Sequence, residues 1–541
     1  MNMETIYYNG KIITMEEKDQ KNSITNAPEA VLIRDGIIIA VGKLAEIEKL
    51  ADTSAFRYDL QGKCLMPSFI DSHSHFVMNG QMSLCADLSA CESYDDIIRA
   101  LQNYIIEHEI SSDGAVIGFG YDHNFLQERN HPNKKILDEI SRDIPILILH
   151  VSGHLACANS AALLLAGINA NTANPEGGII GRQENDNEPS GYLEETSISL
   201  VQKAIVSRLQ IDFATLANHL QDIYIKNGIT TVQDGASTEA DIRTILALNS
   251  SNQLKIDVIA YPLMSTEGMS VMNSYGELYK DYQKHFKIGG YKMILDGSPQ
   301  GKTAWLSSPY LNEKDNYCGY PWMENESVEN MIKQAIAENK QLLAHCNGDA
   351  ASEQYLNAYE KIIKESGNHA DLRPVMIHCQ TVRNDQLDRM SRLKMIASIF
   401  VGHVWYWGDI HIVNLGTERG NRISPVKDAL NRSVIVNFHQ DAPVTKPDML
   451  HSVWCAVNRI SRKGNIIGAE QSVNVYEALK AVTKNAAYQY FEENTKGSIL
   501  IGKRADLVIL DKSPLEIDSI KIKDIRVMET IKDGVTIYKR I

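Results

Sequence analysis

The middle of the chain alternates short apolar runs, several of which end in polar residues, with longer segments in which apolar residues recur every three or four positions. Buried-type runs that alternate with helical patterns indicate βα units and a parallel sheet. We therefore predict eight parallel strands, the number that a (β/α)8 barrel requires. The predicted strands are 68–75, 228–235, 255–263, 291–297, 341–349, 374–381, 395–403 and 433–443.

The two ends of the chain carry a different pattern, in which β-rich runs are separated by Asn-Gly or Asp-Gly pairs. These dipeptides are strong signals for tight hairpin turns. We predict such turns at 9–10 and 35–36 near the N-terminus and at 533–534 near the C-terminus. The β-structure of the two ends is expected to pair into one sheet assembly, and two separate β-caps are the alternative.

Residues 80–215 are too many for a single connection between the first and second strands. This stretch has its own strand-like run at 145–154 and a polar, glycine-rich run at 174–191. We interpret it as an insertion over the barrel mouth that acts as a lid. An independent domain without a role in chemistry is the alternative.

Candidate chemistry lies on the predicted strands, at or near their carboxyl ends. Histidines at alternate strand positions point the same way, so the pair His73 and His75 is suited to grip one ion. Catalytic residues of barrel enzymes come from the carboxyl ends of the strands. The sequence therefore predicts a catalytic site on this rim, where His73, His75, Lys292, His345, His378 and Asp441 lie together.

Six motifs carry a resemblance that runs over nearly the whole chain. They are MPSFIDSHSHF, YKMILDGS, AHCNGDAA, MIHCQ, NFHQDAPV and KGSILIGKRADLVILD. Together they resemble the amidohydrolase superfamily, and more narrowly the amidohydrolase-3 branch that includes N-substituted formamide deformylases. GFGYDH, SGHLACANSAAL and GGIIGR within 80–215 are similar to the same branch. The combination is specific for the superfamily and the branch, and it does not identify a substrate.

The resemblance implies an α/β fold, a distorted (β/α)8 TIM barrel with a composite β-sandwich built from both termini. The sandwich would comprise 1–66 and 492–541, and the barrel 67–491. Residues 80–215 would be a lid or substrate subdomain inserted after barrel strand 1.

The resemblance also implies one or two divalent metal ions, with zinc the favoured metal. His73, His75 and Asp441 would hold the more buried ion, and His345 and His378 the second. Lys292, carboxylated by CO2, would bridge the two ions. A buried ammonium is costly and repels cations, whereas a carbamate supplies anionic oxygens. The alternative for Lys292 is a snorkelling lysine or an ion pair with Asp296, which leaves a single metal.

The activity implied is hydrolysis of an amide-type C–N bond, such as an N-formyl, N-acyl or cyclic amide, by a metal-activated hydroxide. Asp441 would act as general base and then as general acid. Deamination of a heterocycle, ester or lactone cleavage, and a non-enzymatic regulatory role are the alternatives. Asn347, Gly348 and Asp349 follow His345 where superfamily deaminases typically have a nearby glutamate, which favours the hydrolase.

Other residues are candidates for contact with substrate in the mouth. Ordinary packing or surface hydrogen bonding is the alternative for each of them. They are Tyr121, Asp122, His154, Arg182, His403 and Trp405. His439 is expected to be a packed neighbour of the site rather than a ligand.

The composition of the chain limits which kinds of partner this protein is expected to bind. The net charge is −14, from 54 basic and 68 acidic residues, which argues against nucleic acid or an anionic membrane as a partner. No apolar stretch reaches the roughly 18 residues of a spanning helix, and no secretory signal is visible. The eight scattered cysteines fit reduced thiols in the cytoplasm. A small-molecule substrate is expected, and a homodimer is left open.

Overall fold

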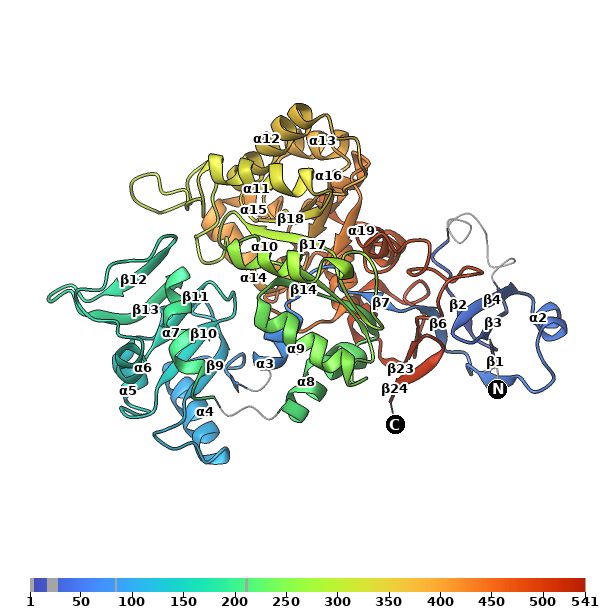
Figure 1. The fold of residues 1–541 in the computed structure, drawn as a ribbon, viewed down its shortest axis with the longest axis horizontal. Coiled ribbons are helices and arrows are strands. Elements are labelled where there is room, and N and C mark those ends of the chain that lie inside the picture. Colours follow the sequence, from blue (N-terminus) through green and yellow to red (C-terminus); the bar gives the residue numbers. More distant parts are fainter. Residues whose placement is uncertain (1–3, 17–27, 83–84, 210–212, 541) are drawn as a thin grey trace.

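The computed structural model describes residues 4–16, 28–82, 85–209 and 213–540. Two parallel sheets with surrounding helices lie at the centre of the molecule (Figure 1). The inserted strands β9 to β13 lie on one side of this centre, and the N- and C-terminal strands lie together on the other. Among the described residues, no helix is long and apolar enough to span a membrane.

The central parallel strands form two sheets. The first has the order β16-β15-β14-β7 and the second the order β17-β18-β19-β20-β21. Each of the eight predicted ranges overlaps one of these strands, and the three-residue β16 was not predicted. The strands are β7 (Phe69–Ile70), β14 (Ile229–Ser237), β15 (Asp257–Pro262), β16 (Phe286–Ile288), β17 (Gly290–Ile294), β18 (Gln341–Cys346), β19 (Val375–His378), β20 (Ile396–Ile399) and β21 (Val436–Phe438).

The expected barrel is TIM-barrel-like, but its strand ladder is not closed over the described residues. The sheets meet at one seam through a single bridge between Leu263 and Lys292, where Met264 N donates to Lys292 O at 2.7 Å. At the other seam His75 N donates to Ala442 O at 2.8 Å. Because β7 pairs as a strand over only two residues, the segment that follows it is held by such isolated hydrogen bonds.

Amphipathic helices surround the two sheets and bury one face in a continuous core. In α12, Tyr355, Leu356 and Tyr359 are buried on one face, as the helical period requires. The helices are α3 (Phe76–Met82), α8 (Phe213–Lys226), α9 (Glu239–Ser250), α10 (Thr266–Ser274), α11 (Asn325–Ala337), α12 (Asp349–Ser366), α13 (Asn384–Arg392), α14 (His403–Leu415), α15 (Thr417–Asn421), α16 (Val426–Asn431), α17 (Met449–Asn458), α18 (Val475–Ala481) and α19 (Lys484–Gln489).

The stretch inserted between β7 and β14 forms a six-stranded sheet of its own, in the order β12-β13-β11-β10-β9-β8. Successive residues of β10 belong to two different hydrophobic clusters, so both faces of the sheet are covered. The predicted strand-like run at 145–154 contains β10. The elements are β8 (Ala86–Asp87), α4 (Tyr94–Glu107), β9 (Val116–Tyr121), α5 (Lys134–Asp138), β10 (Ile146–His150), β11 (Leu155–Ala158), α6 (Ser160–Leu165), β12 (Gly178–Arg182), β13 (Pro189–Glu195) and α7 (Thr196–Val206).

The terminal strands form two sheets, one of which joins the two ends of the chain. Their orders are β4-β3-β1-β5 and β2-β6-β22-β23-β24. The elements are β1 (Glu4–Tyr8), β2 (Lys11–Ile12), β3 (Ala30–Arg34), β4 (Ile37–Gly42), α2 (Leu44–Leu50), β5 (Phe56–Asp59), β6 (Cys64–Pro67), β22 (Leu507–Leu510), β23 (Val527–Lys532) and β24 (Val535–Lys539). The hairpins predicted at 35–36 and 533–534 are confirmed, because antiparallel strands flank both turns.

The hairpin predicted at 9–10 is wrong, because β1 and β2 lie in different sheets. Strand β1 is already paired on both sides, with β3 and with β5, so it has no free edge for β2. The chain instead crosses between sheets at Gly10, where an added Cβ would lie 2.4 Å from Lys63 O. The Asn9-Gly10 turn therefore carries the chain from one sheet into the other.

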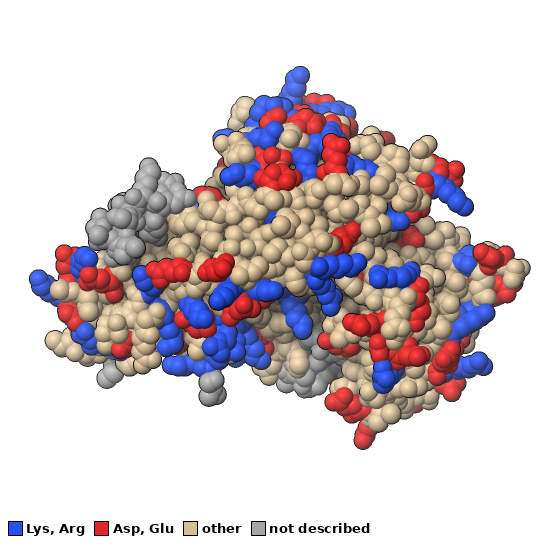
Figure 2. All heavy atoms as spheres, turned by 180° about the vertical axis from the view of Figure 1, so that it is seen from behind, with Lys and Arg blue, Asp and Glu red and all other residues tan. Residues whose placement is uncertain are grey.

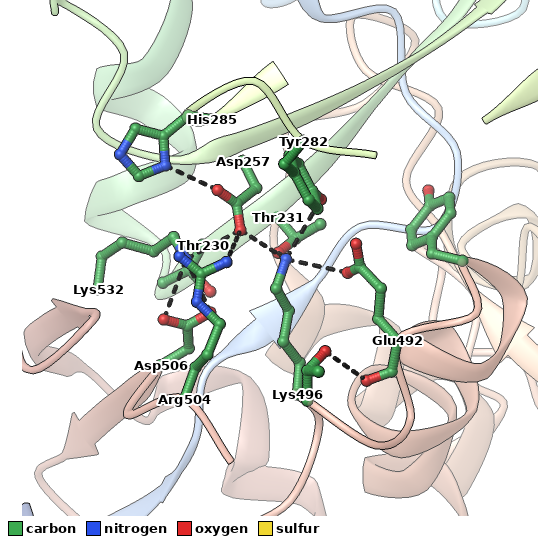
Figure 3. A network of polar contacts seen from close by, with 12 residues as sticks. Thr230, Thr231, Asp257, Tyr282, His285, Glu492, Lys496, Arg504, Asp506 and Lys532 are labelled. Atoms are coloured by element: carbon green, nitrogen blue, oxygen red, sulfur yellow. Dashed lines mark hydrogen bonds and ion pairs between the residues drawn. The ribbon is translucent and has the colours of Figure 1, made fainter. Parts of the chain in front are cut away.

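A buried network of charges attaches the C-terminal segment to the amino end of β15 (Figure 3). Asp257 is fully buried, and its Oδ2 lies 2.5 Å from Lys496 Nζ and 2.9 Å from Lys532 Nζ. His285 Nδ1 lies 2.7 Å from the other oxygen of Asp257. Burial raises the pKa of Asp257, but Lys496 and Lys532 hold it well below its usual range. The carboxylate therefore stays charged at neutral pH.

Charged groups on the surface are mixed in sign. Figure 2 shows acidic and basic side chains interspersed over one face of the molecule.

All eight cysteines are free.

Candidate active site

The residues predicted for the metal site converge where the carboxyl ends of the central strands meet. His73 and His75 follow β7, Lys292 lies in β17 and His345 in β18. His378 ends β19 with a φ of 75°, and Asp441 follows β21 with a φ of 55°. Left-handed backbone at residues other than glycine is strained and is concentrated at functional sites.

Asp441 faces the two histidines that follow β7. Its Oδ1 lies 3.3 Å from His73 Nε2 and 3.3 Å from His75 Nε2. These separations match the edge of about 3.3 Å in a tetrahedron whose metal–nitrogen bonds are about 2.0–2.1 Å. Both separations are therefore those of ligands that share one ion, and His73, His378 and Asp441 form a group whose ligand atoms all lie within 4.8 Å of one another.

Hydrogen bonds on the far side of each imidazole set the tautomers. His73 Nδ1 lies 2.6 Å from Gln233 Oε1, and the Gln233 amide nitrogen donates to Ser72 O at 3.0 Å. The amide oxygen therefore faces the ring, and His73 Nδ1 is the donor. His75 Nδ1 donates to Gly235 O at 2.7 Å in the same way. Both Nε2 atoms thus present lone pairs towards Asp441.

The donor set fits a cation. Asp441 Oδ1 is buried and has no hydrogen-bond partner among the described residues. A carboxylate oxygen and two imidazole lone pairs converge on one point, an arrangement of acceptors that a bound divalent cation stabilises. A carboxylate at this position would bind a metal in its anionic form.

The second half of the site is built around His378. Its Nε2 lies 3.1 Å from His345 Nδ1 and 3.9 Å from Asp441 Oδ2. Behind it, His439 Nε2 lies 3.2 Å from His378 Nδ1, and His439 Nδ1 lies 3.0 Å from Ser398 Oγ. Burial holds the pKa of His345 and His378 well below the usual range, so both rings are neutral.

Lys292 lies beside the first histidine pair. It is 1 % exposed, and its Nζ lies 3.2 Å from His73 Nε2. Burial lowers the pKa of Lys292 to about 7, although nearby Asp441 acts in the opposite direction. Asp296, the alternative partner, instead accepts backbone N–H groups from Asn347 at 2.9 Å and from Gly348 at 2.7 Å. Its carboxylate is therefore engaged with the loop that follows β18.

The insertion contributes His154 to the edge of the site. Its ring centroid lies 5.5 Å from that of His345. Its Nδ1 is 2.8 Å from Glu195 Oε2, and the other oxygen of Glu195 is buried without a hydrogen-bond partner among the described residues. Burial lowers the pKa of His154, but Glu195 together with Asp441 and Asp296 outweighs this effect and the net shift is upward.

Two other substrate-contact candidates, Asp122 and His403, lie beside Trp407. Trp407 Nε1 donates to Asp122 Oδ2 at 2.9 Å, which links the insertion to α14. His403 Nδ1 lies 3.0 Å from His411 Nε2, and the His403 ring lies 4.7 Å from that of Phe400. The His403 ring also lies 4.7 Å from the Trp407 ring, so Asp122 and His403 both contact Trp407.

The remaining three candidates have partners of their own. The Tyr121 hydroxyl lies 3.0 Å from His131 Nδ1. Arg182 Nη1 donates to Asn169 O at 2.9 Å, within the insertion. Trp405 packs with its ring centroid 5.3 Å from that of Trp454.

Two residues that shape the site were not predicted. Gln233 fixes the His73 tautomer, and Glu195 orients His154. Gln233 is a polar residue near the carboxyl end of the predicted strand 228–235. This position on the rim could have identified it in the same way as the predicted residues. Glu195 ends an inserted strand, and no sequence signal connects it to the central sheets.

Comparisons with known proteins agree with this geometry. The Bacillus subtilis protein YtcJ is 28% identical over 558 residues, covering 99% of this chain and 100% of its own. N-substituted formamide deformylase of Arthrobacter pascens is 25% identical over 537 residues, covering 96% of each chain. This chain superposes on the crystal structure of an uncharacterized metal-dependent hydrolase from Pyrococcus horikoshii OT3 with a TM-score of 0.76 at 25% identity. The superposition covers 95% of this chain and 99% of that one. The amidohydrolase family profile matches residues 58–538, and the chain therefore belongs to the amidohydrolase family.

Proposed function

We propose that this protein hydrolyses an amide-type C–N bond of a small molecule, with an N-substituted formamide as the first substrate class to test. The family and the solved structures support metal-dependent hydrolysis in general. The observation that carries the proposal is Asp441 Oδ1, which lies unpartnered between the lone pairs of His73 and His75. The formamide class is suggested by a relative that aligns over 96% of both chains.

His73, His75 and Asp441 would hold one divalent ion, and His345 and His378 a second, with Lys292 as a carbamate between them. Imidazole and carboxylate ligands suit zinc, which we propose as the metal. A bound ion of this kind supplies Lewis acidity, which lowers the pKa of water towards about 7 and polarises a carbonyl oxygen.

Asp441 carries the proton in this proposal. Its carboxylate accepts a proton from the attacking water as the water oxygen bonds to the carbonyl carbon. Asp441 then returns the proton to the amide nitrogen as the C–N bond breaks, which yields an amine and a carboxylic acid. His154, whose Nδ1 lies 2.8 Å from Glu195 Oε2, would donate a hydrogen bond to the carbonyl oxygen of the substrate.

The proposal also assigns roles to the parts of the chain. Residues 1–66 and 492–541 would form one supporting domain, and 67–491 the catalytic one. Residues 80–215 would cover the site as a substrate subdomain. The approach of His154 to His345 and the hydrogen bond from Trp407 to Asp122 support this role, because both join the insertion to the central sheets.

Substrate assays test the activity. Among matched N-alkyl formamides, acetamides and formate esters, we expect the formamides to be hydrolysed fastest. Each formamide turnover should release one amine per formate. Chelation should abolish this turnover, and added Zn²⁺ should restore it. Heterocyclic amines serve as the deaminase control. Turnover confined to that control, with release of ammonia, would contradict the proposal.

Lys292→Ala tests the carbamate. We expect the variant to bind less metal than the wild type, because a bridging anionic ligand is lost. Short carboxylic acids should restore part of the activity by occupying the vacated space. Elemental analysis and rescue assays measure both effects, and Lys302→Ala is the control because Lys302 pairs with Glu313 at the surface. Unchanged metal stoichiometry in Lys292→Ala would argue against a bridging role.

A further inference from the structure

A second group of metal-ligand side chains lies in the insertion and has no part in the proposed reaction. Asp122 and His123 follow the carboxyl end of β9, and His150 ends β10. The two strands are parallel neighbours, with His150 opposite Tyr121. Their carboxyl ends therefore lie together, as in the central sheets.

Three possible ligand atoms of this group converge, all within 4.8 Å of one another. His123 Nδ1 lies 3.2 Å from His150 Nε2, and His150 Nε2 lies 3.4 Å from Asp122 Oδ1. The third separation, between His123 Nδ1 and Asp122 Oδ1, is 3.8 Å. Ligand atoms of a tetrahedral zinc site are separated by about 3.3 Å, so a small contraction of this triangle would complete three coordination bonds.

The burial of the group favours binding of an ion over exposure to solvent. Asp122 is 7 % exposed and the His150 ring is fully buried. The His123 side chain is 19 % exposed, which leaves a route from solvent. Charged groups at such a depth are found paired or bound to metals.

The groups behind the three atoms support coordination. Ser152 lies against His150 Nδ1 with both an acceptor, its Oγ at 2.9 Å, and a donor, its N–H at 3.1 Å. When His150 Nδ1–H donates to Ser152 Oγ, Nε2 is free to bind a metal. Asp122 Oδ1 also accepts the backbone N–H and side-chain Nδ2 of Asn124 at 2.9 Å, and such donors orient ligating carboxylates.

We propose that Asp122, His123 and His150 bind a zinc-type divalent cation, separate from the ions at Asp441, with a fourth position open to water. The other Asp122 oxygen accepts Trp407 Nε1 of α14 at 2.9 Å. An ion at this site therefore fixes the carboxylate that attaches the insertion to α14. The role of the ion is to hold the insertion in place over the central site.

Metal counting tests the site independently of any activity. Full-length protein is stripped of metal, dialysed against Zn²⁺ and measured by elemental analysis. We expect His123→Ala to bind one equivalent of zinc less than the wild type. His131→Gln is the matched control, because His131 packs against His123 with ring centroids 4.0 Å apart but forms a hydrogen bond with Tyr121. Equal zinc content in wild type and His123→Ala would overturn the proposal.

Anomalous scattering at the zinc edge from wild-type crystals soaked in Zn²⁺ provides a second readout that does not require the variant to fold. We expect one peak between Asp122 and His150, in addition to any peak at Asp441. A peak at Asp441 without one at Asp122 would overturn this inference while leaving the proposed function intact. A peak at Asp122 alone would support the inference and contradict the proposed metal centre.

Discussion

Replacing Asp441 by asparagine is expected to lower the turnover number by about 10²–10⁴-fold without loss of the fold. The amide cannot accept the proton of the attacking water, and it carries no charge to offset a cation. Asp441 is also the residue that joins the two halves of the site, through Oδ1 to His73 and His75 and through Oδ2 to His378. No other carboxylate among the described residues is placed within 4.0 Å of both histidines that follow β7.

Turnover and metal content should be measured together with circular dichroism. Asp71→Asn is a stringent control because Asp71 is a buried carboxyl two residues before His73. Burial raises the pKa of Asp71 well above its usual range, so an asparagine there preserves the charge of a neutral group. Asp71 Oδ1 lies 3.4 Å from His73 N and does not face the imidazole nitrogens. Near wild-type turnover in Asp441→Asn would remove Asp441 from the mechanism.

Asp257→Asn is expected to lower the free energy of unfolding by about 3–5 kcal/mol, the usual cost of removing one partner from a buried ion pair. The mutation leaves the buried ammonium groups of Lys496 and Lys532 with one carboxylate fewer, although Glu492 and Asp506 still lie 2.9 Å from them. Each lysine side chain is only 2 % exposed, so water cannot replace the lost charge. Both lysines lie in the C-terminal segment, and the variant should therefore loosen that segment from the amino end of β15.

Denaturant titration and hydrogen exchange measure this loss. Glu48→Gln is the control, because Glu48 and its partner Arg57 are 37% and 49% exposed and such surface pairs contribute below about 1 kcal/mol. The folded-state pKa of Asp257 is depressed, so its contribution is complete above the unfolded pKa of about 3.9 and is lost as the pH falls through the folded pKa. Equal stability of Asp257→Asn and the wild type at pH 7 would contradict the assignment of the network.

Local periodicity along the sequence determined most of the elements. Alternation places Leu147 and Ile148 in different clusters on the two faces of β10, and helical spacing places Tyr355 and Tyr359 on one face of α12. The rim residues were predicted for a related reason, because the carboxyl ends of parallel strands share one edge. Asp441 and His73 therefore meet although they are 368 positions apart in the numbering of the chain.

Tertiary structure alone decided which edges pair and which polar groups meet outside that rim. The turn at Gly10 has the local chemistry of a hairpin, yet β2 pairs with β6 because β3 and β5 already occupy both edges of β1. Glu195 reaches His154 only because β13 and β11 pair within the insertion. A local pattern specifies which way a side chain points, whereas the partner it meets depends on edges and cavities created by distant segments.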